Sequence, residues 1–202
     1  RSAASRAFTG SIMAIFFSVL AAVVVALAIY VMISYNRLVA LKHNVKTAWS
    51  NIDVLLLQRH DELPKLVATC KQHMSYEQET LERVIKARSQ VSEARESSNL
   101  GALGSAEGML SASLGRLFAV AEDYPELKAS QSFQQLQSRI SALEEAIADR
   151  REFYNDSVNF NNITVDAFPT NIIADKFNFF RSKPFKVEQQ KREDVDMVAL
   201  FE

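Results

Sequence analysis

Residues 12–33 read IMAIFFSVLAAVVVALAIYVMI, and this stretch decides the fold. Ser18 and Tyr30 are its polar residues, and it carries no charge. At a rise of about 1.5 Å per residue, the stretch spans about 33 Å as a helix, close to the hydrocarbon thickness of a bilayer. It is also too long for the apolar core of a cleaved signal peptide. The sequence therefore predicts a transmembrane helix over residues 12–34, after an N-terminal flank of residues 1–11.

Small residues recur at every fourth position on one face of this helix, at Ala14, Ser18, Ala22 and Ala26. In lipid, small side chains let two helix backbones approach closely, and this contact favours association. The alternative is a coincidence, because alanine is common in apolar segments. We expect this transmembrane packing face to support a homo-oligomer that is surrounded by membrane lipid.

Basic residues beside the apolar stretch bear on its orientation. Arg1 and Arg6 precede the stretch, whereas Arg37, Lys42 and Lys46 follow it. Cytoplasmic flanks carry the excess of Lys and Arg. We expect a single-pass protein of the cell inner membrane. The excess of one basic residue after the stretch favours a cytoplasmic position for the following domain, but a margin of one charge does not decide the side of the membrane.

The composition excludes several classes of function. The net charge is −1, so no global basic field recruits nucleic acid. The single cysteine, Cys70, excludes an internal disulfide framework. Cys70 and His73 lie one helical turn apart, but two ligands do not make a zinc site. Since the sequence also has no phosphate loop, nucleophile elbow or HExxH motif, we expect no enzyme, no catalytic residue, no cofactor and no metal.

Beyond the anchor, apolar residues recur at intervals of three and four, as in amphipathic helices. We predict helices over residues 35–72, from a cap at Ser75 to about residue 98, over residues 110–124, and from a cap at Ser130 to residue 168. Pro64 is predicted to kink or reset the first of these helices. Residues 100–108, with three of the 5 glycines, are predicted to be a flexible turn.

Four amphipathic helices with short connections predict an all-α fold in which the transmembrane helix is followed by an antiparallel four-helix bundle. The first and last helices are long and the middle two are short. The bundle is expected to occupy residues 35–168. A Phe-rich C-terminal segment and tail, residues 169–202, follow it.

Charged residues interrupt the apolar stripes at positions where the period favours an apolar side chain. A buried arginine has to be paired and hydrogen-bonded, so acidic residues within reach are its expected partners. The predicted interior polar layer consists of Asp53, Arg59, Asp61, Glu77, Arg88 and Arg150. We interpret it as a salt-bridge layer that sets the helix register; the alternative is an arginine-lined interior that binds an anionic or peptide ligand.

The short middle helices leave the membrane-proximal half of the long helices without cover, and an exposed apolar patch of that size normally marks an interaction site. The aromatic run after Pro169 reaches this region. It has three roles open to it: covering its own stripe, lying at the headgroup level, or covering a neighbouring subunit. We expect the main subunit or partner interface here, formed by Trp49, Phe168, Phe177, Phe179, Phe180 and Phe185.

Several motifs together resemble the LemA family, over nearly the whole chain beyond the anchor. The motifs are YNRLV at 35–39, AWSNIDV at 48–54, QRHDELPKLV at 58–67, YEQETL at 76–81, KAR at 86–88, AEDYPELK at 121–128, RREFYN at 150–155 and FPTN at 168–171. The resemblance implies an N-terminally anchored bacterial membrane protein with a helical bundle and without established enzymatic activity.

The resemblance also implies what such a protein does. A magnetosome-membrane branch of the family suggests a role in organising membranes, and frequent neighbourhood with HtpX-type membrane zinc metalloproteases suggests a quality-control partnership. We expect a non-enzymatic scaffold or adaptor that self-associates and organises membrane or partner proteins. One alternative is a regulator or substrate adaptor of a membrane protease in envelope quality control. The other is a ligand-binding sensor that uses the arginine-lined bundle interior.

Overall fold

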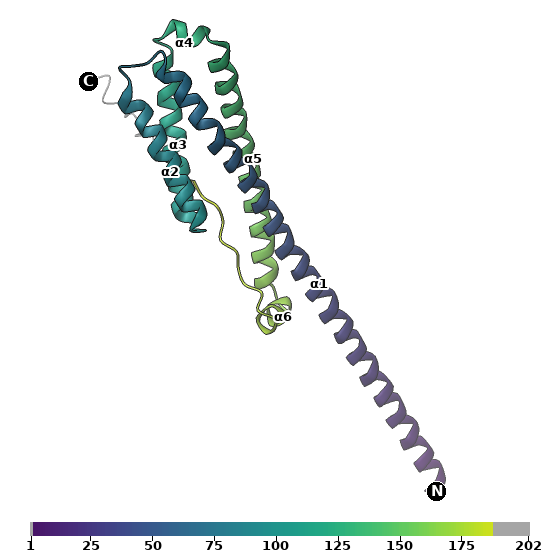
Figure 1. Cartoon of the computed structure of the whole chain (residues 1–202). Helices are drawn as coiled ribbons and strands as arrows, with labels where there is room; N and C mark the ends of the chain where they lie inside the picture. Colours follow the sequence, from purple (N-terminus) through teal and green to yellow (C-terminus); the bar gives the residue numbers. More distant parts are fainter. Residues whose placement is uncertain (1, 188–202) are drawn as a thin grey trace, which may run out of the picture. The chain divides into compact units, whose positions relative to one another are not determined.

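The computed structural model describes residues 2–187, with the side chains of residue 13 and of residues 15–187. Arg1, tail residues 188–202 and the side chains of the predicted N-terminal flank, of Ile12 and of Ala14 therefore lie outside the described part. Within it, all regular secondary structure is helical (Figure 1). The helices are α1 (Ser2–Lys71), α2 (Gln78–Glu96), α3 (Leu100–Ala121), α4 (Pro125–Ala129), α5 (Gln131–Asp166) and α6 (Thr170–Lys176).

Helix α1 joins the apolar stretch to the first bundle helix without a break and continues through Pro64. Among the described residues it is the one helix that is long and apolar enough to cross a membrane. Its apolar side chains from Ile15 to Ile33 are exposed, as expected of a surface that lipid covers. The apolar stretch of α1 therefore indicates a single membrane anchor.

The chain forms two compact units, and α1 and α5 each contribute to both. The first, here the anchor unit, comprises Arg1–Asn44 and Phe160–Ser182. The second, here the bundle unit, comprises Val45–Asn159 and Lys183–Glu202. Each unit has its own cluster of buried apolar residues.

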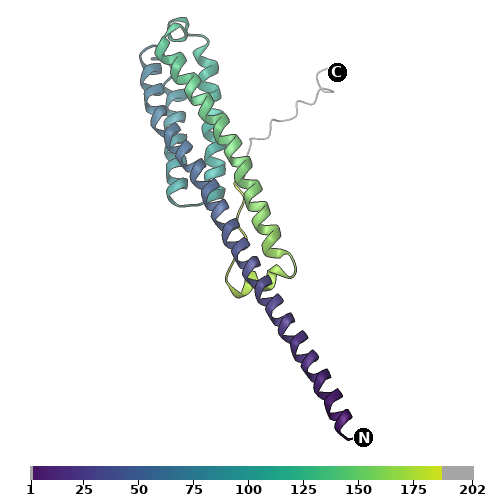
Figure 2. The ribbon, with the colours of Figure 1, turned by 90° about the vertical axis from the view of Figure 1, so that its right-hand side faces the viewer.

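Helices α2 and α3 pack beside the bundle-unit portions of α1 and α5, as both ribbon views show (Figures 1 and 2). The predicted all-α bundle of two long and two short helices is confirmed. Buried residues of α5 recur every seven positions at Phe133, Ile140, Ile147 and Tyr154, the repeat of a left-handed helix pair. The core also holds Ile52, Leu56, Leu66, Leu81, Val84, Leu110, Leu114 and Leu117.

Helix ends show where the local predictions hold and where they are wrong. Ser130 caps α5, because its Oγ accepts a hydrogen bond from the Phe133 backbone N–H at 3.5 Å. Ser75 does not cap α2, which begins at Gln78 after Glu77 and has no side-chain cap. The expected third helix, 110–124, is α3, which begins earlier, at Leu100, and ends at Ala121, and Pro125 begins the short α4.

The predicted flexible turn at residues 100–108 is wrong, because these residues form the first turns of α3. Asn99 caps this helix: its Oδ1 accepts from the backbone N–H groups of Gly101 at 3.2 Å and Ala102 at 3.1 Å. Gly104 is needed for packing, since a Cβ at this position would lie 1.8 Å from the backbone oxygen of Lys186. Gly104 thus permits close approach of the chain at residue 186 within a continuous helix.

Helix α6, which the sequence pattern did not reveal, organises the anchor unit. Its Ile173 and Ala174 are buried against Leu38 of α1 and Val165 of α5. Beyond α6, Asn162 of α5 holds the extended chain at Ser182 with two hydrogen bonds: its Nδ2 donates to the Ser182 carbonyl at 2.9 Å, and its Oδ1 accepts from the Ser182 N–H at 2.8 Å.

Candidate functional site

The bundle interior contains an ion pair between Arg59 of α1 and Glu107 of α3. Arg59 is 2% exposed and Glu107 is also buried. The Nη2 of Arg59 donates to both carboxylate oxygens of Glu107, at 2.5 and 2.6 Å. Because a buried arginine without a partner is very unfavourable, this pairing is what allows a charge in the core.

A second carboxylate lies beside this pair. Glu144 of α5 has its Oε1 at 3.7 Å from the Nη1 of Arg59. Burial raises the pKa of Glu144, against the opposing effects of a hydrogen bond from Ser111 and the charge of Arg59. Ser111 Oγ donates to the Glu144 carboxylate at 3.0 Å. The interior thus holds one arginine between two carboxylates, and burial raises the pKa of one of them, Glu144.

Other members of the predicted polar layer form separate pairs instead of one layer. Asp53 accepts from Arg95 at 2.5 and 3.1 Å, at the half-buried edge of the bundle. Arg88 donates to the His60 backbone carbonyl at 3.0 Å and lies 2.6 Å from its ring Nε2. Burial and the Arg88 charge lower the pKa of His60, which suits a neutral ring that accepts this bond.

Glu77, just before α2, contacts Tyr124, just before α4. The Tyr124 hydroxyl donates to Glu77 Oε1 at 3.4 Å. Burial and the neighbouring Glu77 charge raise the pKa of Tyr124. This contact joins the loop before α2 to the loop after α3. It does not involve Arg59 or Glu107.

Asp61 and Arg150 are exposed, so their placement in the interior was wrong. In α1 the buried face runs through Arg59, Glu62 and Leu63, and Asp61 falls between these positions. In α5 the half-buried position after Ile147 is the fourth residue on, Arg151, and not the third, Arg150. The seven-residue repeat sets this phase.

Two buried glutamates were missed by the sequence reasoning. Glu107 lies in the glycine-rich stretch that was expected to be a turn, so no helical face was assigned to it. Glu62 is buried and pairs with Arg139 at 3.2 Å and Lys65 at 3.3 Å. A search for acidic residues at core-facing positions of α3 would have found Glu107 as the partner of Arg59.

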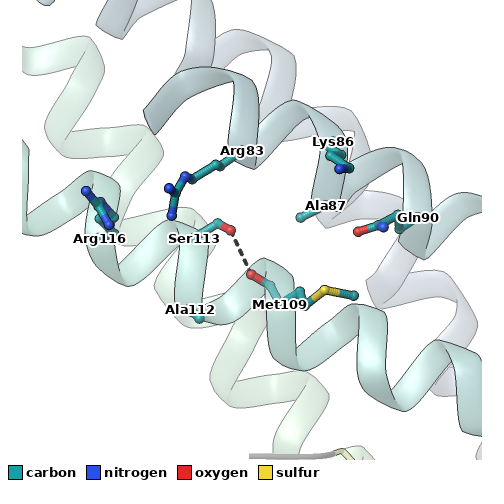
Figure 3. A pocket seen from close by; sticks show the side chains of 8 residues that line it. All are labelled: Arg83, Lys86, Ala87, Gln90, Met109, Ala112, Ser113 and Arg116. Carbon is teal, nitrogen blue, oxygen red and sulfur yellow. Dashed lines mark hydrogen bonds between the residues drawn. The ribbon is translucent and has the colours of Figure 1, made fainter. Parts of the chain in front are cut away.

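A basic groove lies on the surface between α2 and α3, with a volume of about 420 Å³. Figure 3 shows its side chains on the two helices. Arg83 is paired with Glu79 at 2.5 Å. Among the described residues, Lys86 and Arg116 have no ion-pair partner. The basic groove is lined by Arg83, Lys86, Ala87, Gln90, Met109, Ala112, Ser113 and Arg116.

The chemistry of the basic groove suits an anionic, partly apolar ligand. Three cations surround a lining that also includes the side chain of Met109 and the methyl groups of Ala87 and Ala112. Ser113 Oγ is engaged with the Met109 carbonyl at 2.8 Å, as Figure 3 also shows. An Asp- or Glu-containing peptide segment can offer both carboxylates and apolar contacts to such a surface.

An apolar groove lies between α1 and α2, with a volume of about 280 Å³. Pro64 lies in its wall, together with Leu63, Val67 and Ile85. Lys71 and Arg88 also line it. This composition suits an apolar side chain or segment more than an anion.

The predicted aromatic interface is divided between the two units. Phe185 is fully buried in the bundle core, with ring contacts to Trp49 at 5.8 Å, so its assignment to a subunit interface was wrong. Asn155 fixes it there, since the Asn155 amide exchanges hydrogen bonds of 2.8 and 3.0 Å with the Phe185 backbone. Trp49 also contacts the Tyr154 ring at 5.6 Å.

The remaining aromatic residues belong to the anchor unit. Phe177 and Phe179 contact the Tyr35 ring at 5.0 and 5.7 Å. Phe179 is half-buried, whereas Phe168 and Phe180 are largely exposed. In the transmembrane packing face, Ser18, Ala22 and Ala26 are exposed, and Ser18 Oγ bonds the Ile15 carbonyl at 2.8 Å. Its role in self-association stays a prediction.

Metal-ligating residue types do not gather within the part of the chain that the structure describes, where no group of three or more His, Cys, Asp or Glu could hold an ion. Cys70 is fully buried. Burial raises the pKa of its thiol to about 11. The thiol therefore behaves as a small apolar side chain.

Comparison with known proteins gives a consistent grouping. Residues 48–198 match the LemA family. The chain is 25% identical over 186 residues to magnetosome protein MamQ 2 of Paramagnetospirillum magneticum, covering 81% of this chain and 68% of that protein. It is 27% identical over 169 residues to protein LemA of Metamycoplasma hominis, covering 82% and 74%. A further relative, magnetosome protein MamQ of Magnetospirillum gryphiswaldense, is 22% identical over 188 residues, covering 79% and 69%.

Proposed function

The chain belongs to the LemA family, and from this premise we propose that it is a non-enzymatic membrane-anchored adaptor. In this proposal the protein self-associates and holds partner proteins at the membrane. The basic groove of the bundle unit is the docking surface, and its ligand is an acidic segment of a partner protein.

The charge of the groove is the observation that carries the proposal. Arg83, Lys86 and Arg116 line one surface site, and Lys86 and Arg116 lack ion-pair partners among the described residues. Their side chains are exposed, so the fold does not need them for its core. Complementary charge increases the rate and specificity of association more than its affinity.

The membrane context supports an adaptor because α1 carries both the apolar stretch and one wall of the bundle core. We propose the inner membrane as its location and the cytoplasm as the side of the bundle, on the excess of basic residues after the apolar stretch. A reporter fused after Glu202 tests the side. Reporter activity confined to the periplasm would contradict it.

The relatives support an organising role. Two of the matched proteins are named as magnetosome proteins. The resemblance to this family implied a role in organising membranes, which an adaptor with a fixed anchor would serve by bringing partners together.

The apolar groove beside Pro64 favours a second candidate function, that of substrate adaptor for a membrane protease. A groove lined by Leu63, Val67 and Ile85 can receive an apolar side chain from an unfolded segment. The ligand-sensor alternative is weaker, because the donors on Arg59 Nη2 are already occupied by Glu107.

Charge reversal in native membranes tests the adaptor proposal. A carbodiimide joins lysine amines to carboxylates in direct contact, so Lys86 should form crosslinks to acidic residues of the partner. The variant carrying Arg83→Glu and Arg116→Glu keeps Lys86 and should lose these crosslinks. Lys128→Glu is the matched control, since Lys128 is exposed and pairs with Glu122 outside the groove. Unchanged Lys86 crosslinks in the double variant would contradict the proposal.

A further inference from the structure

The segment formed by the turn after α5, by α6 and by the residues just after α6 presents apolar side chains outward from the anchor unit. Phe168 is 81% exposed, Ile172 60% and Phe180 75%. Large apolar side chains that gather on one surface usually contact another molecule or a membrane. We call residues 167–180 the reentry turn. Packing within the chain does not explain why its apolar side chains are exposed.

The reentry turn contacts α1 near the end of the apolar stretch. Thr170 Oγ1 lies 3.4 Å from the hydroxyl of Tyr30, which belongs to the apolar stretch. Tyr35 packs against Phe177 just beyond that stretch. Tyr30 precedes Ile33, the last residue of the stretch, by about 4.5 Å of helix rise. The turn thus lies beside the last turns of the segment that crosses the membrane.

The inner side of the turn is packed, so its outward residues are fixed in direction. Ile173 and Ala174 are buried against Leu38. The chain after the turn is held by the two Asn162 hydrogen bonds to Ser182. Because this side is already satisfied, Phe168 and Ile172 cannot turn inward without breaking the cluster.

Basic side chains accompany the apolar ones. Lys176 ends α6, is exposed and has no ion-pair partner among the described residues. Lys42 lies 5.9 Å from the centre of the Phe179 ring. Arg181 pairs with Asp166 at 2.8 Å. Aromatic rings combined with Lys and Arg are the side chains favoured at the boundary between headgroups and acyl chains.

We propose that the reentry turn is a second membrane contact, in which Phe168, Ile172 and Phe180 enter the lipid boundary. Lys176 binds an anionic phospholipid headgroup. The occupant is the bilayer and not a second copy of the chain, because the anchor already brings this face to the lipid and the basic residue matches an anionic surface. This inference rests on the membrane anchor and is independent of the basic groove.

Spin labelling of the full chain in vesicles of phosphatidylcholine and phosphatidylglycerol tests the proposal. Single cysteines replace Phe168, Ile172 or, as a matched control, Phe153, which is 55% exposed in the bundle unit. The parent chain serves as the blank, because its Cys70 is buried. Labels at Phe168 and Ile172 should favour oxygen over an aqueous nickel chelate at a depth of about 5–10 Å, and the Phe153 label should remain aqueous.

A charge variant separates lipid binding from simple apolar contact. Lys176→Glu should make the Phe168 label shallower in mixed vesicles and leave it unchanged in phosphatidylcholine alone. A Phe168 label as aqueous as the Phe153 label would overturn the proposal. So would spin–spin broadening at Phe168 that disappears on dilution with unlabelled chain, since a second copy would then cover this face.

Discussion

One nitrogen of Arg59, Nη2, donates to both carboxylate oxygens of Glu107, although the two residues are 48 positions apart in sequence. The pair is closed off from solvent. It links α1 to α3 and makes the register of these helices depend on a charge pair inside an apolar core.

Removing Glu107 should therefore cost much more than removing the whole pair. Glu107→Ala leaves a buried guanidinium without a partner and should lower the free energy of unfolding by about 3–5 kcal/mol. Urea unfolding followed by the fluorescence of the single tryptophan, Trp49, measures this. The double variant Arg59→Met with Glu107→Leu is the control and should be near neutral. Equal losses in both variants would show that the charge pair is not responsible.

Glu144 should make stability depend on pH. Burial raises its pKa above the ordinary 4.5. The folded state then binds the proton more tightly than the unfolded state, so stability decreases as pH rises from 4.5 through the raised pKa. Glu144→Gln should remove this slope and preserve stability at neutral pH. An unchanged slope in urea titrations across the acidic range would contradict the assignment to Glu144.

Cys70 should be inert in the folded protein. Burial raises the pKa of its thiol to about 11, so little thiolate exists at neutral pH. A colorimetric thiol reagent should react only after denaturant is added. Rapid reaction under native conditions would mean that α1 opens around Cys70.

Two glycines of α3 should respond in opposite directions to alanine. At Gly104 a Cβ would collide with the Lys186 backbone, so Gly104→Ala should destabilise by about 1–3 kcal/mol. At Gly115 nothing lies within 4 Å, so Gly115→Ala should stabilise by about 0.4–1 kcal/mol through helix propensity. Urea unfolding compares the two, and the same sign at both positions would argue against the packing of residues 183–187 on α3.

Strong periodic patterns allowed the main elements to be predicted. The uncharged apolar stretch and the stripe through Ile52 predicted the two helical parts that α1 joins, and Ser130 marked the start of α5. Helix α6 was missed because only 7 residues provide too little period to recognise. The glycines at 101, 104 and 108 looked like a turn, because the contact of Gly104 with residue 186, which is distant in sequence, cannot be read from the local pattern.

The site was harder to predict than the fold. The apolar period predicted that Arg59 lies in the bundle interior. Its partner Glu107 was not predicted, because residues 100–108 were expected to form a turn and not a helix with a buried face. Arg150 was chosen over Arg151 because a spacing of three and a spacing of four are equally helical, and only packing decides between them. Arg83, Lys86 and Arg116 form a groove only when α2 and α3 are side by side, and along the sequence they look like an ordinary solvated surface.

Photo-crosslinking from within the basic groove tests the adaptor proposal most directly. A photoreactive residue at Ala112, which lines the groove, is compared in native membranes with one at Ala148, an exposed alanine of α5 outside it. We predict that Ala112 joins to an Asp- and Glu-rich peptide of another protein, that Ala148 does not, and that the Arg83→Glu, Arg116→Glu variant loses the product. Equal products at both positions, or a product from residues 188–202 of this chain, would contradict the proposal.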